Sequence, residues 1–118
     1  MVTLLIYGCK QKEYESIRTK CADIVAKVSD EKLIIYDTTE CEKIPDFAIV
    51  NICTEGGLDN VYKVRERFKD VAIMLISNTR ISPMQYLNPA IHPLSLIISP
   101  YTDNEMETVL YDFIQKRL

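Results

Sequence analysis

The sequence has no tryptophan, only one histidine, and no apolar run of the roughly 20 residues that a membrane-spanning helix needs. Its four cysteines, at positions 9, 21, 41 and 53, include no CxxC pair, so nothing in their spacing supports a zinc site or another bound metal. The first apolar run, Val2–Tyr7, follows no basic stretch and is too short for a signal peptide. We therefore expect a cytoplasmic protein with reduced cysteines and no membrane contact.

An excess of positive charge is also missing. The 118 residues include 14 Lys and Arg against 17 Asp and Glu, which gives a net charge of −3. Because domains that bind nucleic acid usually carry a basic patch, we expect no direct contact with nucleic acid. Apolar residues make up 47% of the chain, which excludes disorder, and the length fits a single domain, 1–118, with one core.

Five short apolar runs are the candidates for strands. They are rich in Ile, Val and Leu, and their apolar residues do not alternate with polar ones. The runs are Thr3–Tyr7, Lys32–Tyr36, Phe47–Cys53, Val71–Ile76 and Leu94–Ile98. Continuous apolar strands of this kind are typical of a parallel sheet that is covered by helices on both faces.

Three segments between these runs have apolar residues at the spacing of one helix face. The first carries Tyr14, Ile17, Cys21, Ile24, Val25 and Val28, the second Leu58, Val61, Val64 and Phe68, and the third Met106, Val109, Leu110, Phe113 and Ile114. Thr102 and Glu105 precede the third stripe at the spacing of a capping box, which satisfies free amides at the start of a helix. The sequence therefore predicts three amphipathic helices.

Two further helices are weakly indicated. Thr38–Ile44 leaves room for about two turns before Pro45. Ser82 and Pro83 have the residue types of an N-cap and a first helical turn, and Pro89 ends that helix soon afterwards. Five strands that alternate with five helices predict an α/β fold, a three-layer (α/β/α), doubly wound, five-stranded parallel sheet.

Ligands bind to such sheets beyond the carboxyl ends of the strands. The residues to examine there are Gly8, Cys9, Asn51, Ser77, Ser99 and Pro100. In the order of its elements and at these positions, the chain resembles the receiver domain of response regulators, the CheY-like fold, of the type found in front of LytTR-type DNA-binding domains. The resemblance covers all 118 residues and implies the flavodoxin-like strand order 2-1-3-4-5.

The same comparison with the receiver family shows which phosphorylation residues are missing. The family's acidic pair after the first strand, which holds Mg²⁺, corresponds to Gly8 and Cys9. Its phosphoacceptor aspartate corresponds to Asn51, and the lysine that follows its fifth strand corresponds to Ser99. The hydroxyl residue of the fourth strand is retained as Ser77.

The chemistry of these residues leads to the same conclusion. Asn51 is a neutral amide and a poor nucleophile, Cys9 offers a soft sulfur where Mg²⁺ prefers oxygen, and Ser99 has no charge to stabilise a phosphoryl group. Leu96 stands at the position of the family's switch aromatic. We therefore predict a pseudo-receiver, a non-enzymatic signalling module with no catalytic residue and no cofactor. The resemblance further implies that it forms the N-terminal part of a transcriptional regulator, or else a single-domain protein that stands alone.

The alternative is a phosphocysteine or redox carrier that uses Cys9 on the same fold. Cys9 follows the first strand, as the phosphocysteine of sugar-phosphotransferase IIB domains does, but Lys10–Glu13 lack the Gly and Ser of a phosphate-binding loop. Cys53 follows the neighbouring third strand, so the two thiols are candidates for a redox pair, although buried free cysteines usually act as small apolar residues. A flavin site is disfavoured because no Trp is present to stack on the ring.

Three residues have simpler structural interpretations. We expect Asn51 to hydrogen-bond the backbone of its own loop, as Asn side chains commonly do. Cys21 lies on the apolar stripe of the first helix and is expected in the core. His92 has no Cys or Ser placed by the sequence as its partner, so we expect no catalytic role for it.

Residues 81–100 contain no Asp, Glu, Lys or Arg and hold four of the five prolines. A surface element without charges is typical of a contact surface, and the resemblance implies that this face serves dimerisation and output. We predict an interface with a second copy or a partner protein, formed by Met84, Tyr86, Leu87, Ile91 and Tyr101. The other interpretation is that these residues only cover the edge of the sheet.

Overall fold

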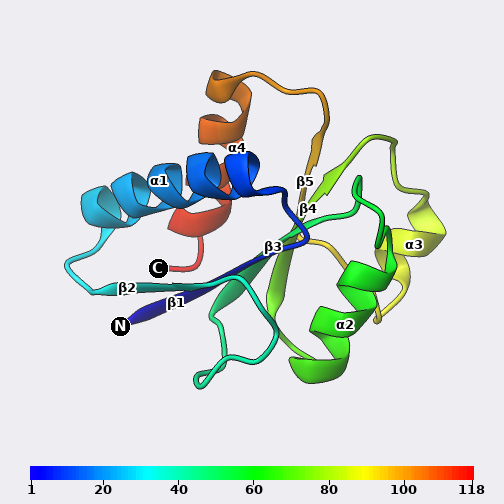
Figure 1. Cartoon of the computed structure of the whole chain (residues 1–118), viewed down its shortest axis with the longest axis horizontal. Coiled ribbons are helices and arrows are strands. Elements are labelled where there is room, and N and C mark those ends of the chain that lie inside the picture. The colour runs from blue at the N-terminus through cyan, green and yellow to red at the C-terminus, as the bar shows by residue number, and fades with distance from the viewer.

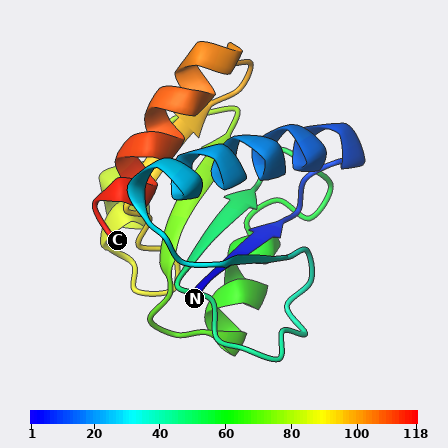
Figure 2. The same ribbon diagram turned by 90° about the vertical axis from the view of Figure 1, so that its left-hand side faces the viewer.

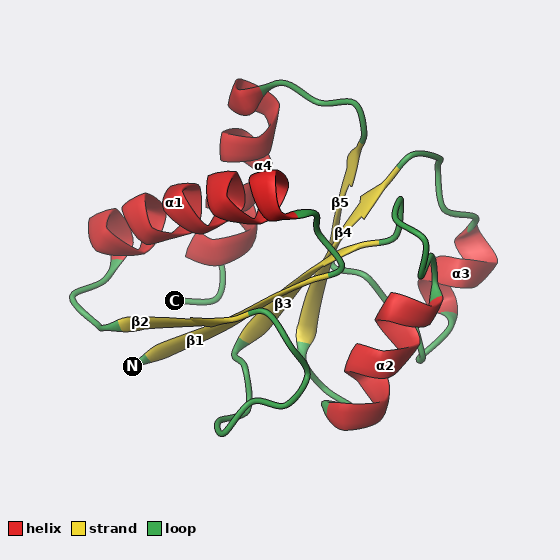
Figure 3. Ribbon diagram, viewed as in Figure 1, coloured by secondary structure: helices red, strands yellow, loops and turns green.

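Five parallel strands form the centre of the protein, whose structure, a computed structural model, describes all residues 1–118. The strands are β1 (Val2–Tyr7), β2 (Leu33–Tyr36), β3 (Phe47–Asn51), β4 (Ala72–Ser77) and β5 (Ser95–Ile98). Their order in the sheet is β2-β1-β3-β4-β5, and every neighbouring pair is parallel. The predicted fold class and strand order are therefore confirmed (Figure 3).

Side chains of the central strands alternate between two separate cores. On β3, Phe47 and Ile49 lie in one cluster, while Ala48 and Val50 lie in the other. The same alternation on β1 and β4 explains why these strands have continuous apolar sequences, because each face of the sheet is covered.

The chain forms four helices, and three of them supply that cover. The four helices are α1 (Gln11–Val28), α2 (Asp59–Arg67), α3 (Pro83–Leu87) and α4 (Asp103–Gln115). The helices α1 and α4 lie side by side on one face of the sheet, and α2 lies on the opposite face (Figures 1 and 2). No helix is long and apolar enough to cross a membrane.

Both predicted caps are present. Thr102 and Glu105 form a capping box at the start of α4, with the Thr102 hydroxyl accepting from the Glu105 amide at 3.1 Å. Ser82 caps α3 in the same way and pairs with Gln85. The predicted apolar stripe of α1 is also confirmed in the core, where Cys21 is fully buried.

The predicted helix at Thr38–Ile44 is wrong, because residues 37–46 form a loop. The segment has no apolar stripe: Cys41 enters the core, while Ile44 points to solvent with 78% of its surface exposed. The Thr38 hydroxyl accepts from the Glu40 amide at 3.3 Å, a local turn that competes with helix formation. The loop closes where Asp46 Oδ2 accepts from the amide of Thr3 at 2.7 Å.

Candidate functional site

The sheet places three of the predicted site residues, Gly8, Asn51 and Ser77, along one edge. Tyr7 of β1 pairs with Val50 of β3. The next residue of each segment, Gly8 and Asn51, therefore lies at the end of one of two neighbouring strands. Asn51 is itself paired with Ile76 of β4, and Ser77 is paired with Ile98 of β5. The carboxyl ends of β1, β3, β4 and β5 therefore meet where the sequence predicted a site. We call this end of the sheet the carboxyl edge.

Asn51 is buried at this edge, and both its amide oxygen and its amide nitrogen form hydrogen bonds. Its Oδ1 accepts from the Cys53 amide at 2.6 Å, which confirms the predicted bond to the loop backbone. Its Nδ2 donates to Glu13 Oε1 at 2.5 Å. An aspartate at this position would present a second carboxylate to Glu13 instead of a donor.

Glu13 is the residue that sequence reasoning missed. It lies in the first turn of α1 and is half-buried, and its second oxygen, Oε2, accepts a hydrogen bond from the Tyr101 hydroxyl. Glu13 lies outside the apolar stripe predicted for this helix. The available signal was its position, because the start of α1 lies at the same edge of the sheet as the end of β1.

A second buried amide, Asn60 of α2, supports the loops around Asn51. Its Nδ2 donates to the backbone oxygen of Asn51 at 2.9 Å and to Thr54 Oγ1 at 3.3 Å. The Thr54 hydroxyl in turn donates to the backbone oxygen of Gly8 at 2.9 Å. Gly8 has φ +84°, and a Cβ there would lie 2.6 Å from both the Asn51 oxygen and the Asn60 amide nitrogen. Close packing at this point therefore requires glycine.

The surroundings of the two thiols at this edge disfavour the thiolate form. Burial is the largest cause that raises the pKa of Cys9 far above its ordinary value, and the negative charge of Glu13 adds to it. The same two causes raise the pKa of Cys53. Because the thiolate is the reactive form, this environment opposes the use of Cys9 as a phosphocysteine or redox carrier. All four cysteines are free thiols.

Ser77 is buried, and its hydroxyl forms hydrogen bonds with the backbone of the loop that follows it. It donates to the backbone oxygen of Thr79 at 2.7 Å and accepts from the Thr79 amide at 3.1 Å. The amide of Ser99 donates to the backbone oxygen of Ser77 at 2.7 Å, and a cis peptide bond joins Ser99 to Pro100. These contacts supply no cationic group at the carboxyl edge.

The edge does not fit the Mg²⁺ ion that the receiver resemblance implies. Gly8 has no side chain, and the Glu13 and Asn51 oxygens already accept hydrogen bonds. No group of three or more His, Cys, Asp and Glu side chains is arranged to hold a metal ion. The hard oxygen ligands that Mg²⁺ requires are therefore not assembled here.

The predicted interface residues separate into two groups. Met84 and Leu87 of α3 are 83% and 78% exposed, and Tyr86 is also exposed. Ile91, in contrast, is 1% exposed and belongs to the core on the α2 face, so its prediction as an interface residue is wrong. Tyr101 packs against the core on the α1 face and bonds Glu13, which assigns its hydroxyl to the carboxyl edge.

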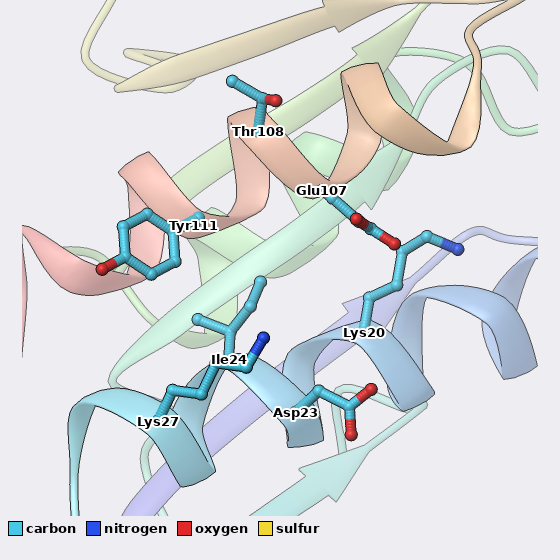
Figure 4. A pocket seen from close by; sticks show the side chains of 7 residues that line it. All are labelled: Lys20, Asp23, Ile24, Lys27, Glu107, Thr108 and Tyr111. Atoms are coloured by element: carbon cyan, nitrogen blue, oxygen red, sulfur yellow. The ribbon is translucent and has the colours of Figure 1, made fainter.

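A separate hollow of about 370 Å³ lies between α1 and α4. Figure 4 shows Lys20, Asp23 and Lys27 on the α1 side and Glu107 and Tyr111 on the α4 side. Two basic and two acidic side chains balance there, and this hollow therefore favours neither sign of ligand charge.

The comparison with solved structures relates the fold to response regulators. The chemotaxis response regulator CheY4 of Vibrio cholerae superposes with a TM-score of 0.66 and 12% identity, over 100% of this chain and 99% of that one. A two-component response regulator from Clostridium difficile superposes with a TM-score of 0.64 and 11% sequence identity, over 98% of both chains. A Burkholderia thailandensis protein assigned to pilus assembly superposes with a TM-score of 0.60 and 13% sequence identity, over 97% of this chain and 98% of that one.

At these identities the similarity defines a fold, that of CheY-like receiver domains. No protein-family model matches the sequence. No curated protein matches it either. The structural neighbours include response-regulator receiver domains and a protein assigned to pilus assembly.

Proposed function

We propose that this chain is a pseudo-receiver, a signalling module that has the receiver fold, does not accept a phosphoryl group and acts by binding another protein. The observation that carries the proposal is the bond from Asn51 Nδ2 to Glu13 Oε1. Where no Mg²⁺ ligands are assembled, the Glu13 carboxylate and an amide donor form a matched pair, whereas a second carboxylate at position 51 would be repulsive. The surroundings of residue 51 thus suit asparagine.

The chemistry of phosphorylation supports the same proposal. Transfer to a carboxylate needs an anionic oxygen, a bound Mg²⁺ and a cation that balances the developing charge. Asn51 supplies no anionic oxygen, the carboxyl edge assembles no Mg²⁺ ligands, and Ser99 supplies no cation. We infer that the domain is not an enzyme and that its output depends on its surface.

The exposed face of α3 is the surface that we assign to this role. It buries none of its five residues, and Met84 and Leu87 present apolar side chains to solvent. A second copy of the chain, or a partner protein, would cover them. We further propose that the chain is the N-terminal part of a two-component-type transcriptional regulator, a proposal that rests on the receiver resemblance and that the neighbouring coding sequence would test.

Titration with beryllofluoride and Mg²⁺, followed by NMR, tests the loss of phosphorylation. We expect no saturable shifts at Asn51 or Ser77, while a receiver that retains its aspartate responds under the same conditions. Asn51→Asp should also fail to respond, because the metal ligands and the lysine are still missing. Saturable shifts in the wild-type chain would contradict the proposal.

A further inference from the structure

Arg65 is a buried cation at the amino-terminal end of the sheet, opposite the carboxyl edge. Only 9% of its surface is exposed. Its guanidinium donates to the backbone oxygens of Lys69 at 3.1 Å, Ile91 at 3.4 Å and His92 at 3.3 Å, and also to that of Val71. These bonds join the end of α2, the start of β4 and the loop before β5.

The charge of Arg65 is incompletely balanced. Its Nε is buried and has no hydrogen-bond partner. None of the four ion pairs in the structure includes Arg65. Burial lowers the pKa of Arg65, and the nearby Asp70 opposes that shift without forming an ion pair. A buried cation without a paired anion is unfavourable unless another negative group approaches it.

Arg65 is one of the residues that line a hollow of about 500 Å³. Arg65 and Lys69 contribute two positive charges to its lining and Asp70 one negative charge, which leaves one net positive charge among these three side chains. Volumes of several hundred Å³ are typical of sites for small molecules. The charge balance therefore favours a ligand with a single negative charge.

Apart from His92, the rest of the lining is apolar. Leu87, Pro89 and Leu94 form walls of the hollow, and both leucines are largely exposed in the absence of a ligand. A ligand with an apolar tail would remove these side chains from water, which stabilises the complex in proportion to the area covered. A multiply charged phosphate would gain nothing from these walls and would meet Asp70.

We propose that this hollow is a binding site for a small monocarboxylate with an apolar tail. The carboxylate lies toward Arg65 and accepts from the Lys69 ammonium, while the tail packs on Leu87, Pro89 and Leu94. None of these residues belongs to the carboxyl edge, but Leu87 is shared with the α3 face that we assign to protein binding.

Titration of the full chain with hexanoate, monitored by the backbone amide shifts of Val71 and Leu94, tests the site. We expect saturable shifts with a dissociation constant of about a millimolar, as suits so small a ligand. Hexanamide has the same tail and no charge, and it should bind much more weakly. The proposal would be overturned if hexanoate caused no saturable shifts, or if hexanamide bound equally well.

Two charge reversals give a matched comparison. Lys69→Glu should abolish measurable hexanoate binding, while Lys63→Glu, an exposed position on α2 that does not line the hollow, should leave it unchanged. Equal losses in both variants would mean that only the overall charge matters, which would also overturn the proposal. Both positions are exposed, so these variants avoid the loss of folding that substitution of the buried Arg65 would bring.

Discussion

The Tyr101 hydroxyl donates a hydrogen bond to Glu13 Oε2, which joins two residues 88 positions apart in the chain. The other oxygen of the same carboxylate accepts from Asn51. Glu13 therefore connects the start of α1 with the end of β3 and with the loop between β5 and α4. In a receiver with an aspartate at position 51, this arrangement would place two carboxylates together.

Removal of the Glu13 carboxylate should destabilise the fold. Glu13→Ala leaves the buried Asn51 Nδ2 without its partner, and we expect a loss of about 1–3 kcal/mol in the free energy of unfolding. Urea denaturation measures it. Glu15→Ala is the control on the same helix, since Glu15 is exposed and should change stability by less than about 0.5 kcal/mol. Equal effects of the two substitutions would show that the carboxylate does not connect these elements.

Glycine at position 8 should be far less replaceable than glycine at position 57. Both have positive φ, but a Cβ at Gly8 would lie 2.6 Å from two polar atoms, while a Cβ at Gly57 would meet nothing within 4 Å. We expect Gly57→Ala to cost about 1 kcal/mol from backbone strain alone, and Gly8→Ala to cost about 2–4 kcal/mol. Thermal or urea denaturation compares them. Similar losses would mean that the loops at the carboxyl edge can move apart.

Stability should fall at alkaline pH partly through Cys21. Burial raises its pKa from 9.0 to about 12, so the folded state holds the thiol proton more tightly than the unfolded state. This contribution is complete below the unfolded pKa of 9.0 and is lost as the pH rises toward about 12.

The matched variant for this pH dependence is Cys21→Ala, which has no thiol to titrate. We expect wild type to lose up to about 1.4 kcal/mol per pH unit more than the variant above about pH 9. Urea denaturation over this range gives the difference between the two proteins. Parallel pH profiles would show that Cys21 does not contribute.

The α3 face should control self-association if a second copy is the partner. Leu87→Asp places a carboxylate in the proposed contact and should convert a dimer to a monomer in sedimentation, with the circular dichroism spectrum unchanged. Ile44→Asp is the control, because Ile44 and Leu87 are equally exposed, at 78%. A wild-type chain that sediments as a monomer at high concentration would contradict the dimer, and α3 would then be left to a different partner.

Sequence pattern predicted the sheet and most helices because those elements depend on short-range regularities. The continuous apolar runs at Phe47–Asn51 and Ala72–Ser77 follow from strands buried on both faces. The Thr102–Glu105 capping box depends on spacing alone. The length of segment 37–46 permits a helix, but its residues contain no apolar stripe, and the segment forms a loop.

Residue identity also determined part of the site. The amide at position 51, the absent side chain at position 8 and the absent lysine at position 99 are properties of single residues, which no tertiary contact can change. They were sufficient to predict that the chemistry of phosphorylation is missing.

Only the tertiary structure decided which side chains surround Asn51. Glu13, Asn60 and Tyr101 come from α1, α2 and the loop before α4, and they meet because the sheet brings three distant segments to one edge. The tertiary structure likewise placed Ile91 in the core and left Arg65 buried without an ion pair. Local sequence cannot specify such contacts, because a polar residue on a helix looks the same in sequence whether its helix face meets solvent or the end of a neighbouring strand.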